Sequence, residues 1–222
     1  HYTTSTELIL IDRWVYTMKQ YQGSHGLHVA AWRDSIIDVL DNASNEFSRI
    51  MAVRVDLHHP RILDNGDTVC CFPNLKSGEI SRFINSLKAM LAAHEYRRAQ
   101  NGTRIYPNTL RDMWAKEYSQ SGKCHYHACL VFNKDAYYHL GSYDDDCLRG
   151  MIINAWYSAL GLQPEDCPGL VHFPENGKYI LDKNKPGFIF DYHALLKRLE
   201  YLTKVDSKVF GEGDRNFGCS RG

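Results

Sequence analysis

Two histidines one residue apart are the leading candidates for chemistry in this chain. His125 and His127 flank Tyr126 inside an apolar run that reads as a buried β-strand. Alternate side chains of a strand share a face, so the two imidazoles point the same way, about 6.6 Å apart along the backbone. This separation allows both rings to bind one metal ion.

A carboxylate is expected opposite these histidines. Residues 109–118 read as a second strand, and the polar, glycine-containing residues 119–123 read as a turn. If the two strands pair around that turn, Glu117 falls opposite His125 and shares its face. The sequence therefore predicts a divalent-metal site formed by Glu117, His125 and His127. Such a donor set suits Mn²⁺ or Mg²⁺, which we favour over Zn²⁺.

Tyr201 is the candidate nucleophile. Residues 191–204 read as a helix that Asp191 can cap. At about 100° per residue, four basic side chains fall within about 60° of Tyr201 if the helix continues: Lys197, Arg198, Lys204 and Lys208. A phenol in such a setting can attack phosphorus, with the cations stabilising the phenolate and the flanking phosphates. The alternative is a half-exposed tyrosine on a solvated helix. Tyr192 lies about 180° away, toward the leucine side.

Composition restricts the classes of function. Lys plus Arg and Asp plus Glu both number 26, so the net charge is zero and any affinity for nucleic acid must come from a local patch or a metal. No apolar segment is long enough for a membrane span. Seven scattered cysteines without a C-x-x-C pair do not support a zinc ribbon and suggest a reducing cytoplasm. The chain starts at His1 without a signal peptide, and we interpret it as a trimmed or partial sequence.

The hydrophobic pattern predicts an α+β fold, with helices packed on an antiparallel sheet. We expect a single domain over residues 1–222, with an N-terminal helical part (1–47) and a catalytic core (48–222). Helices are expected at 5–21, 27–47, 77–100, 143–160 and 191–204, and further strands at 50–57 and 169–173. Ser77 is expected to cap one helix, and Asp144, Asp145 and Asp146 to occupy the first turn of another.

Together, these motifs resemble the HUH endonucleases, which include the rolling-circle replication initiators. More narrowly, residues 112–117, 125–134, 201–204 and 215–222 are similar to replication-initiation proteins of filamentous phages (inoviruses) and cryptic prophages. The resemblance covers roughly residue 49 to the C-terminus.

The resemblance implies a ferredoxin-like core with a central antiparallel sheet. It implies His125 and His127 as metal ligands, Glu117 as the third ligand and Tyr201 as nucleophile, assisted by Lys204. Residues 54–57 occupy the place of the family's first motif strand. Asp56 or His58 is therefore a possible supporting or alternative ligand. We also expect DNA contacts from four basic residues: Arg54, Lys197, Arg198 and Lys208.

The implied activity is metal-dependent nicking and joining of single-stranded or hairpin DNA through a 5′-phosphotyrosyl intermediate. Such an enzyme would initiate rolling-circle replication of a phage or mobile element. Tyr192 and Tyr201 do not share a helix face, so we expect a single-tyrosine enzyme. Unwinding would come from elsewhere, for example a host helicase. Two alternatives remain: a catalytically inactive DNA-binding relative, and a metal-dependent hydrolase that uses water as nucleophile.

Overall fold

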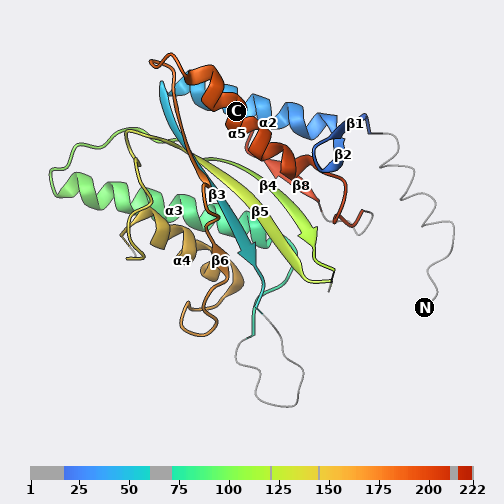
Figure 1. The fold of residues 1–222 in the computed structure, drawn as a ribbon. Helices are drawn as coiled ribbons and strands as arrows, with labels where there is room; N and C mark the ends of the chain where they lie inside the picture. The colour runs from blue at the N-terminus through green and yellow to red at the C-terminus, as the bar shows by residue number, and fades with distance from the viewer. Residues whose placement is uncertain (1–17, 61–71, 121, 145, 211–214, 222) are drawn as a thin grey trace.

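The fold is an antiparallel sheet between two layers of helices (Figure 1). The structure is a computed structural model that describes residues 18–60, 72–120, 122–144, 146–210 and 215–221. The strands of the main sheet are β3 (Arg49–His58), β4 (Arg111–Tyr118), β5 (Cys124–Asn133), β6 (Val171–His172), β7 (Lys178–Asp182) and β8 (Phe217–Cys219). Their order is β6-β3-β5-β4-β8, and β7 also pairs with β3. The α+β prediction is confirmed.

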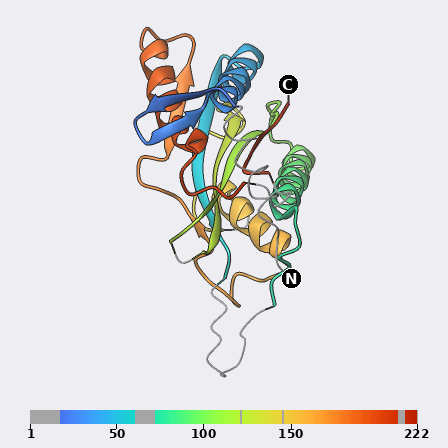
Figure 2. The same ribbon diagram turned by 90° about the vertical axis from the view of Figure 1, so that its right-hand side faces the viewer.

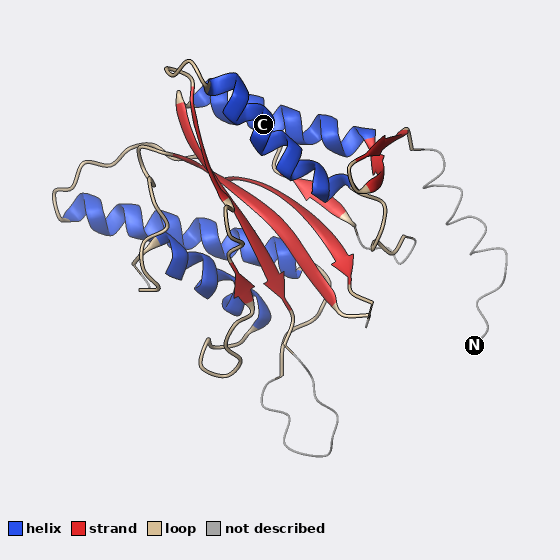
Figure 3. Ribbon diagram, in the orientation of Figure 1, coloured by secondary structure: helices blue, strands red, loops and turns tan. Residues whose placement is uncertain are grey.

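Helices cover both faces of this sheet (Figures 2 and 3). They are α2 (Ala30–Glu46), α3 (Glu79–Gln100), α4 (Leu148–Leu160) and α5 (Phe188–Leu199), followed by the 3₁₀ turn η1 (Glu200–Thr203). Strand β3 alternates as its sequence predicts. Met51 and Val53 pack with α3 and α4, whereas Ile50 and Ala52 pack with α2 and α5. The sheet therefore separates two cores, and the face toward α2 and α5 carries the polar candidates.

The central hairpin has the predicted register. Strands β4 and β5 pair antiparallel with Glu117 opposite His125 and Ala115 opposite His127. Strand β3 lies on the other side of β5, with Asp56 opposite His127 and His58 opposite His125. The polar ends of three neighbouring strands, β3, β5 and β4, therefore lie together on the same face of the sheet.

The helix expected at 27–47 is confirmed over residues 30–46, but residues 20–29 are not helical as expected. Strands β1 (Gln20–Gly23) and β2 (Gly26–Val29) form a hairpin, and α2 begins only at Ala30. Gly26 turns the chain with φ +92°, a conformation that favours glycine. Most of the helix expected at 5–21 lies outside the described residues.

Helix boundaries differ from the predictions for local reasons. Gly78, not Ser77, is the N-cap of α3, without a side-chain capping bond. Helix α4 starts after Cys147, so Asp144 and Asp146 precede it instead of lying in its first turn. Asp191 lies within the first turn of α5 and is not its cap. Strands β7 and β8 were not predicted, because their short segments lack a clear alternation.

None of the described helices combines the length and apolarity needed to cross a membrane.

Candidate metal and tyrosine site

The predicted metal ligands do come together. One ligand atom from each of Glu117, His125 and His127 lies within 4.8 Å of the other two. The hairpin register puts the three side chains on the face toward α2 and α5. Glu117 is only 1% exposed, so its carboxylate is held inside the fold where water cannot solvate it.

Asp56 orients His127. Its Oδ1 atom lies 2.5 Å from Nδ1 of His127, while Nε2 of the same ring faces Glu117 Oε2 at 3.6 Å. A carboxylate on one imidazole nitrogen fixes the ring and directs the other nitrogen at a metal. Burial opposes the charge of Asp56, but the His127 contact holds the pKa of Asp56 below its ordinary value. Of the two residues that the sequence left open, Asp56 is the one in contact with His127.

His58 supports His125 by stacking. The ring centroids are 5.8 Å apart, and the planes are inclined by 18°. Burial, followed by the charge of the neighbouring His127, lowers the pKa of His125. A neutral imidazole keeps the lone pair that a metal needs. Two nitrogens, one carboxylate and a supporting carboxylate therefore fit a divalent ion.

Two lysines share the Glu117 carboxylate. Lys204 Nζ lies 3.1 Å from Oε2 and Lys208 Nζ lies 3.1 Å from Oε1, and Ser207 Oγ donates to Oε2 at 2.9 Å. Burial pushes the pKa of Glu117 up, but the nearby ammonium groups, Lys208 foremost, hold it below its ordinary value. Lys208, which we expected to contact DNA, is not exposed in this arrangement. Its side chain is fully buried against Glu117, and burial lowers its pKa to about 8.

Tyr201 lies next to this cluster. Its phenol oxygen accepts a hydrogen bond of 2.7 Å from Lys204 Nζ, and its ring meets the His127 ring edge-on at 5.2 Å. The Arg54 guanidinium lies 5.9 Å from the Tyr201 ring centroid. The α-helix predicted through Lys204 ends at Leu199, so Tyr201 lies on η1 and the basic helical face stops there.

An open cleft of about 560 Å³ leads to Tyr201. Arg54, Asp56 and His127 line its floor, and the exposed Lys197 and Arg198 line its α5 side. Arg54 is itself buried and pairs with Asp56 at 3.3 Å. Among the predicted DNA-binding residues, Lys197 and Arg198 are therefore the ones with exposed side chains.

Tyr192 is separated from the cleft. Its hydroxyl donates to Asp41 Oδ1 at 2.8 Å, and its ring packs against the core beneath α2. Burial raises the pKa of Tyr192 well above its ordinary value. This position agrees with its predicted orientation toward the leucine side.

The β1–β2 hairpin contributes residues that sequence reasoning missed. The His25 ring lies 5.1 Å from the Tyr201 ring, and His28 Nδ1 lies 2.9 Å from Thr203 Oγ1. The Val205 amide donates to the Leu27 carbonyl at 2.8 Å. The hairpin thus holds the chain on both sides of Tyr201. In the sequence, this hairpin is indicated only by the cluster of small and polar residues at 23–26, which marks a turn.

Comparison with known proteins identifies the family. The YagK/YfjJ C-terminal domain family matches residues 12–220. The chain belongs to this family. It is 62% identical over 205 residues to "Uncharacterized protein YagK" of Escherichia coli (strain K12), covering 92% of this chain and 99% of that protein. It is 45% identical over 208 residues to "Uncharacterized protein YfjJ" of the same strain, covering 91% and 99%. The site described above therefore lies within the matched family segment.

Proposed function

We propose that this chain nicks and joins single-stranded DNA through Tyr201, with a divalent metal at Glu117, His125 and His127. The observation that carries the proposal is the 2.7 Å contact between the Tyr201 oxygen and Lys204 Nζ, beside the ring of His127. A nucleophile, a cation and a group of side chains able to bind a metal, all close together, are the parts that phosphoryl transfer to a tyrosine requires.

The fold supports the same reading. The succession β3–α3–β4–β5–α4–β6 and the sheet order β6-β3-β5-β4 agree with a ferredoxin-like arrangement of the kind that the HUH resemblance implies. Strand β5 carries the paired histidines next to the strand that carries Asp56. We regard the chain as a single-tyrosine relative of HUH replication initiators, acting on a phage or mobile element.

The proposed reaction exchanges one phosphoester for another. The phenol of Tyr201 loses its proton to solvent, and its oxygen attacks the scissile phosphorus. The new O–P bond forms as the P–O3′ bond breaks, and the departing O3′ takes up a proton. Lys204 stabilises the phenolate, and a divalent ion at the cluster would neutralise charge on a non-bridging oxygen. The 5′-phosphotyrosyl bond keeps the energy of the phosphodiester, so a 3′-hydroxyl can reverse the step.

Covalent trapping tests this proposal. The wild-type chain, incubated with Mn²⁺ and a panel of single-stranded and hairpin oligonucleotides, should give a protein–DNA adduct on a denaturing gel. Tyr201→Phe removes only the attacking oxygen and should abolish the adduct, whereas Tyr192→Phe should retain it. Lys204→Ala should slow adduct formation about 10²-fold without abolishing it, since Lys204 stabilises charge but forms no bond.

Metal binding is measured separately. Calorimetry with Mn²⁺ should detect a site in the wild type and in Tyr201→Phe, but not in His127→Ala. Cleavage without an adduct would favour a hydrolase that uses water. DNA binding without cleavage at any oligonucleotide or metal would favour a non-catalytic DNA-binding protein. A nucleotide found on a tyrosine other than Tyr201 would refute the assignment of the nucleophile.

A further inference from the structure

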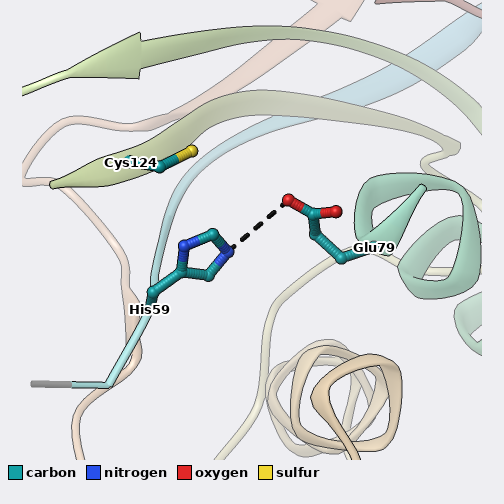
Figure 4. Close-up of side chains that lie close together, drawn as sticks. All are labelled: His59, Glu79 and Cys124. Carbon is teal, nitrogen blue, oxygen red and sulfur yellow. Dashed lines mark ion pairs between the residues drawn. The ribbon is translucent and has the colours of Figure 1, made fainter. Parts of the chain in front are cut away.

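A second group of metal-binding side chains lies on the opposite face of the sheet. His59 follows β3 directly, Cys124 begins β5 and Glu79 begins α3 (Figure 4). One ligand atom from each residue lies within 4.8 Å of the other two. The Glu117, His125 and His127 cluster lies on the other side of the same strands. The two groups are therefore separate.

His59 is held in place but lacks a hydrogen bond at one nitrogen. Its ring stacks on Trp156, with centroids 5.9 Å apart and planes inclined by 10°. Its Nε2 atom is buried and finds no hydrogen-bond partner among the described residues. Glu79 Oε1 is 3.6 Å from that nitrogen, too far for a hydrogen bond. A buried nitrogen without a hydrogen-bond partner is unusual, and a bound metal ion would explain it.

Glu79 is oriented by a second residue. Its side chain is nearly inaccessible, and Tyr126 donates a hydrogen bond of 2.7 Å to Oε1. Supporting hydrogen bonds of this kind fix the direction of metal-binding carboxylates. Burial lowers the pKa of His59, which keeps its imidazole neutral and able to donate a lone pair.

We propose that His59, Glu79 and Cys124 bind a thiophilic divalent ion of the Zn²⁺ class. An imidazole nitrogen, a thiolate and a carboxylate suit Zn²⁺, whereas Mg²⁺ and Mn²⁺ prefer oxygen ligands. Binding replaces the Cys124 S–H bond with an S–metal bond, and the proton goes to the buffer. A cavity of about 690 Å³ is lined by His59 and Cys124, and also by their neighbours His58 and His125.

The proposed ion has a structural role. It joins the end of β3, the start of β5 and the start of α3, three elements far apart in sequence. His58 and His125 are the immediate neighbours of His59 and Cys124, and their side chains belong to the opposite face. The ion therefore fixes the strand ends from which the first site is built. This inference does not depend on the proposed nicking activity.

Co²⁺ is the probe that distinguishes the two sites. A thiolate is a soft ligand, and its bond to Co²⁺ gives a charge-transfer absorption band in the near ultraviolet. Titration of the full wild-type chain with Co²⁺ should produce this band, and Zn²⁺ should displace it. Cys124→Ser should lose the band. Cys219→Ser, which alters another half-buried cysteine, should keep it, as should His127→Ala, which alters only the first site.

A second variant covers the case in which Cys124→Ser fails to fold. Glu79→Gln preserves the shape of the side chain and should weaken Co²⁺ binding by more than about tenfold, measured from the same band. Zn²⁺ should also raise the melting temperature of the His127→Ala variant. It should not raise that of the double variant that carries both Glu79→Gln and His127→Ala. Absence of the band in the wild type, or an undiminished band in folded Cys124→Ser, overturns the proposal. Loss of the adduct with an intact band would refute only the nicking activity.

Discussion

Two carboxylates on strand β4 show how surroundings set the charge of a residue. Glu117 lies between the ammonium groups of Lys204 and Lys208, which hold its pKa below the ordinary value despite burial. Asp112 lies on the opposite face, and only the charge of Lys88 acts against its burial. Burial therefore raises the pKa of Asp112 to about 6. The first carboxylate is kept ionised by its neighbours, and the second is destabilising once it ionises.

Asp112 should make stability fall as pH rises. The native state holds the Asp112 proton more tightly than the unfolded chain, so the free energy of unfolding falls between the ordinary pKa of 3.8 and about 6. Asp112→Asn removes this titration and should stabilise the protein by about 2–3 kcal/mol near pH 7.5, with little effect near pH 4. Urea unfolding at the two pH values measures this difference. Equal effects at both would show that Asp112 does not titrate as described.

At the scale of elements, the β1–β2 hairpin determines how firmly Tyr201 is held. His28 is completely buried, and its Nδ1 lies 2.9 Å from Thr203 Oγ1 and 3.1 Å from the Glu200 carbonyl. These contacts tie the hairpin to η1, which carries the tyrosine. A Cβ at Gly23 would lie 2.5 Å from the His28 ring, so the hairpin closes tightly only because residue 23 has no side chain.

His28→Ala should loosen the tyrosine without touching the metal ligands. We expect adduct formation to slow about tenfold and the free energy of unfolding to fall by about 2 kcal/mol, because a buried hydrogen-bonded side chain is lost. Mn²⁺ affinity, measured by calorimetry, should stay unchanged. Gly23→Ala should have the same effect by displacing the ring, and His193→Ala, at an exposed histidine, should have none. A parallel loss of Mn²⁺ binding would contradict a positioning role.

At the scale of the whole molecule, charge gives little general attraction for DNA. The net charge is zero, and Lys204 and Lys208 both pair with the buried Glu117 carboxylate. Among the described residues that line the cleft, Lys197 and Arg198 are exposed cations, and Arg54 is paired to Asp56. Binding should therefore depend on shape and a small number of phosphate contacts.

The salt dependence of binding measures those contacts. With two or three phosphates neutralised, the logarithm of the single-strand binding constant should fall against log salt with a slope of about −2. Lys197→Ala should reduce the slope by about 0.7, whereas Lys76→Ala, at an exposed lysine just before α3 on the other side of the sheet, should not. Tight binding to random duplex with a much steeper slope would contradict this description.

The sequence by itself determined the parts of this protein that depend on local pattern. The polar turn at residues 119–123 specified the β4–β5 register, because the position and length of a hairpin turn determine which residues of the two strands lie opposite each other. It therefore predicted that Glu117, His125 and His127 share a face, and helical geometry separated Tyr192 from Tyr201.

Tertiary structure alone decided what depends on distant segments. Lys208 lies inward, paired with the buried Glu117 from a distant strand, and the helix before Tyr201 ends in a 3₁₀ turn held by a hairpin from residues 20–29. The second group also comes together only in the folded chain. Its members, His59, Glu79 and Cys124, come from three elements far apart in sequence, and no local spacing predicts that they meet.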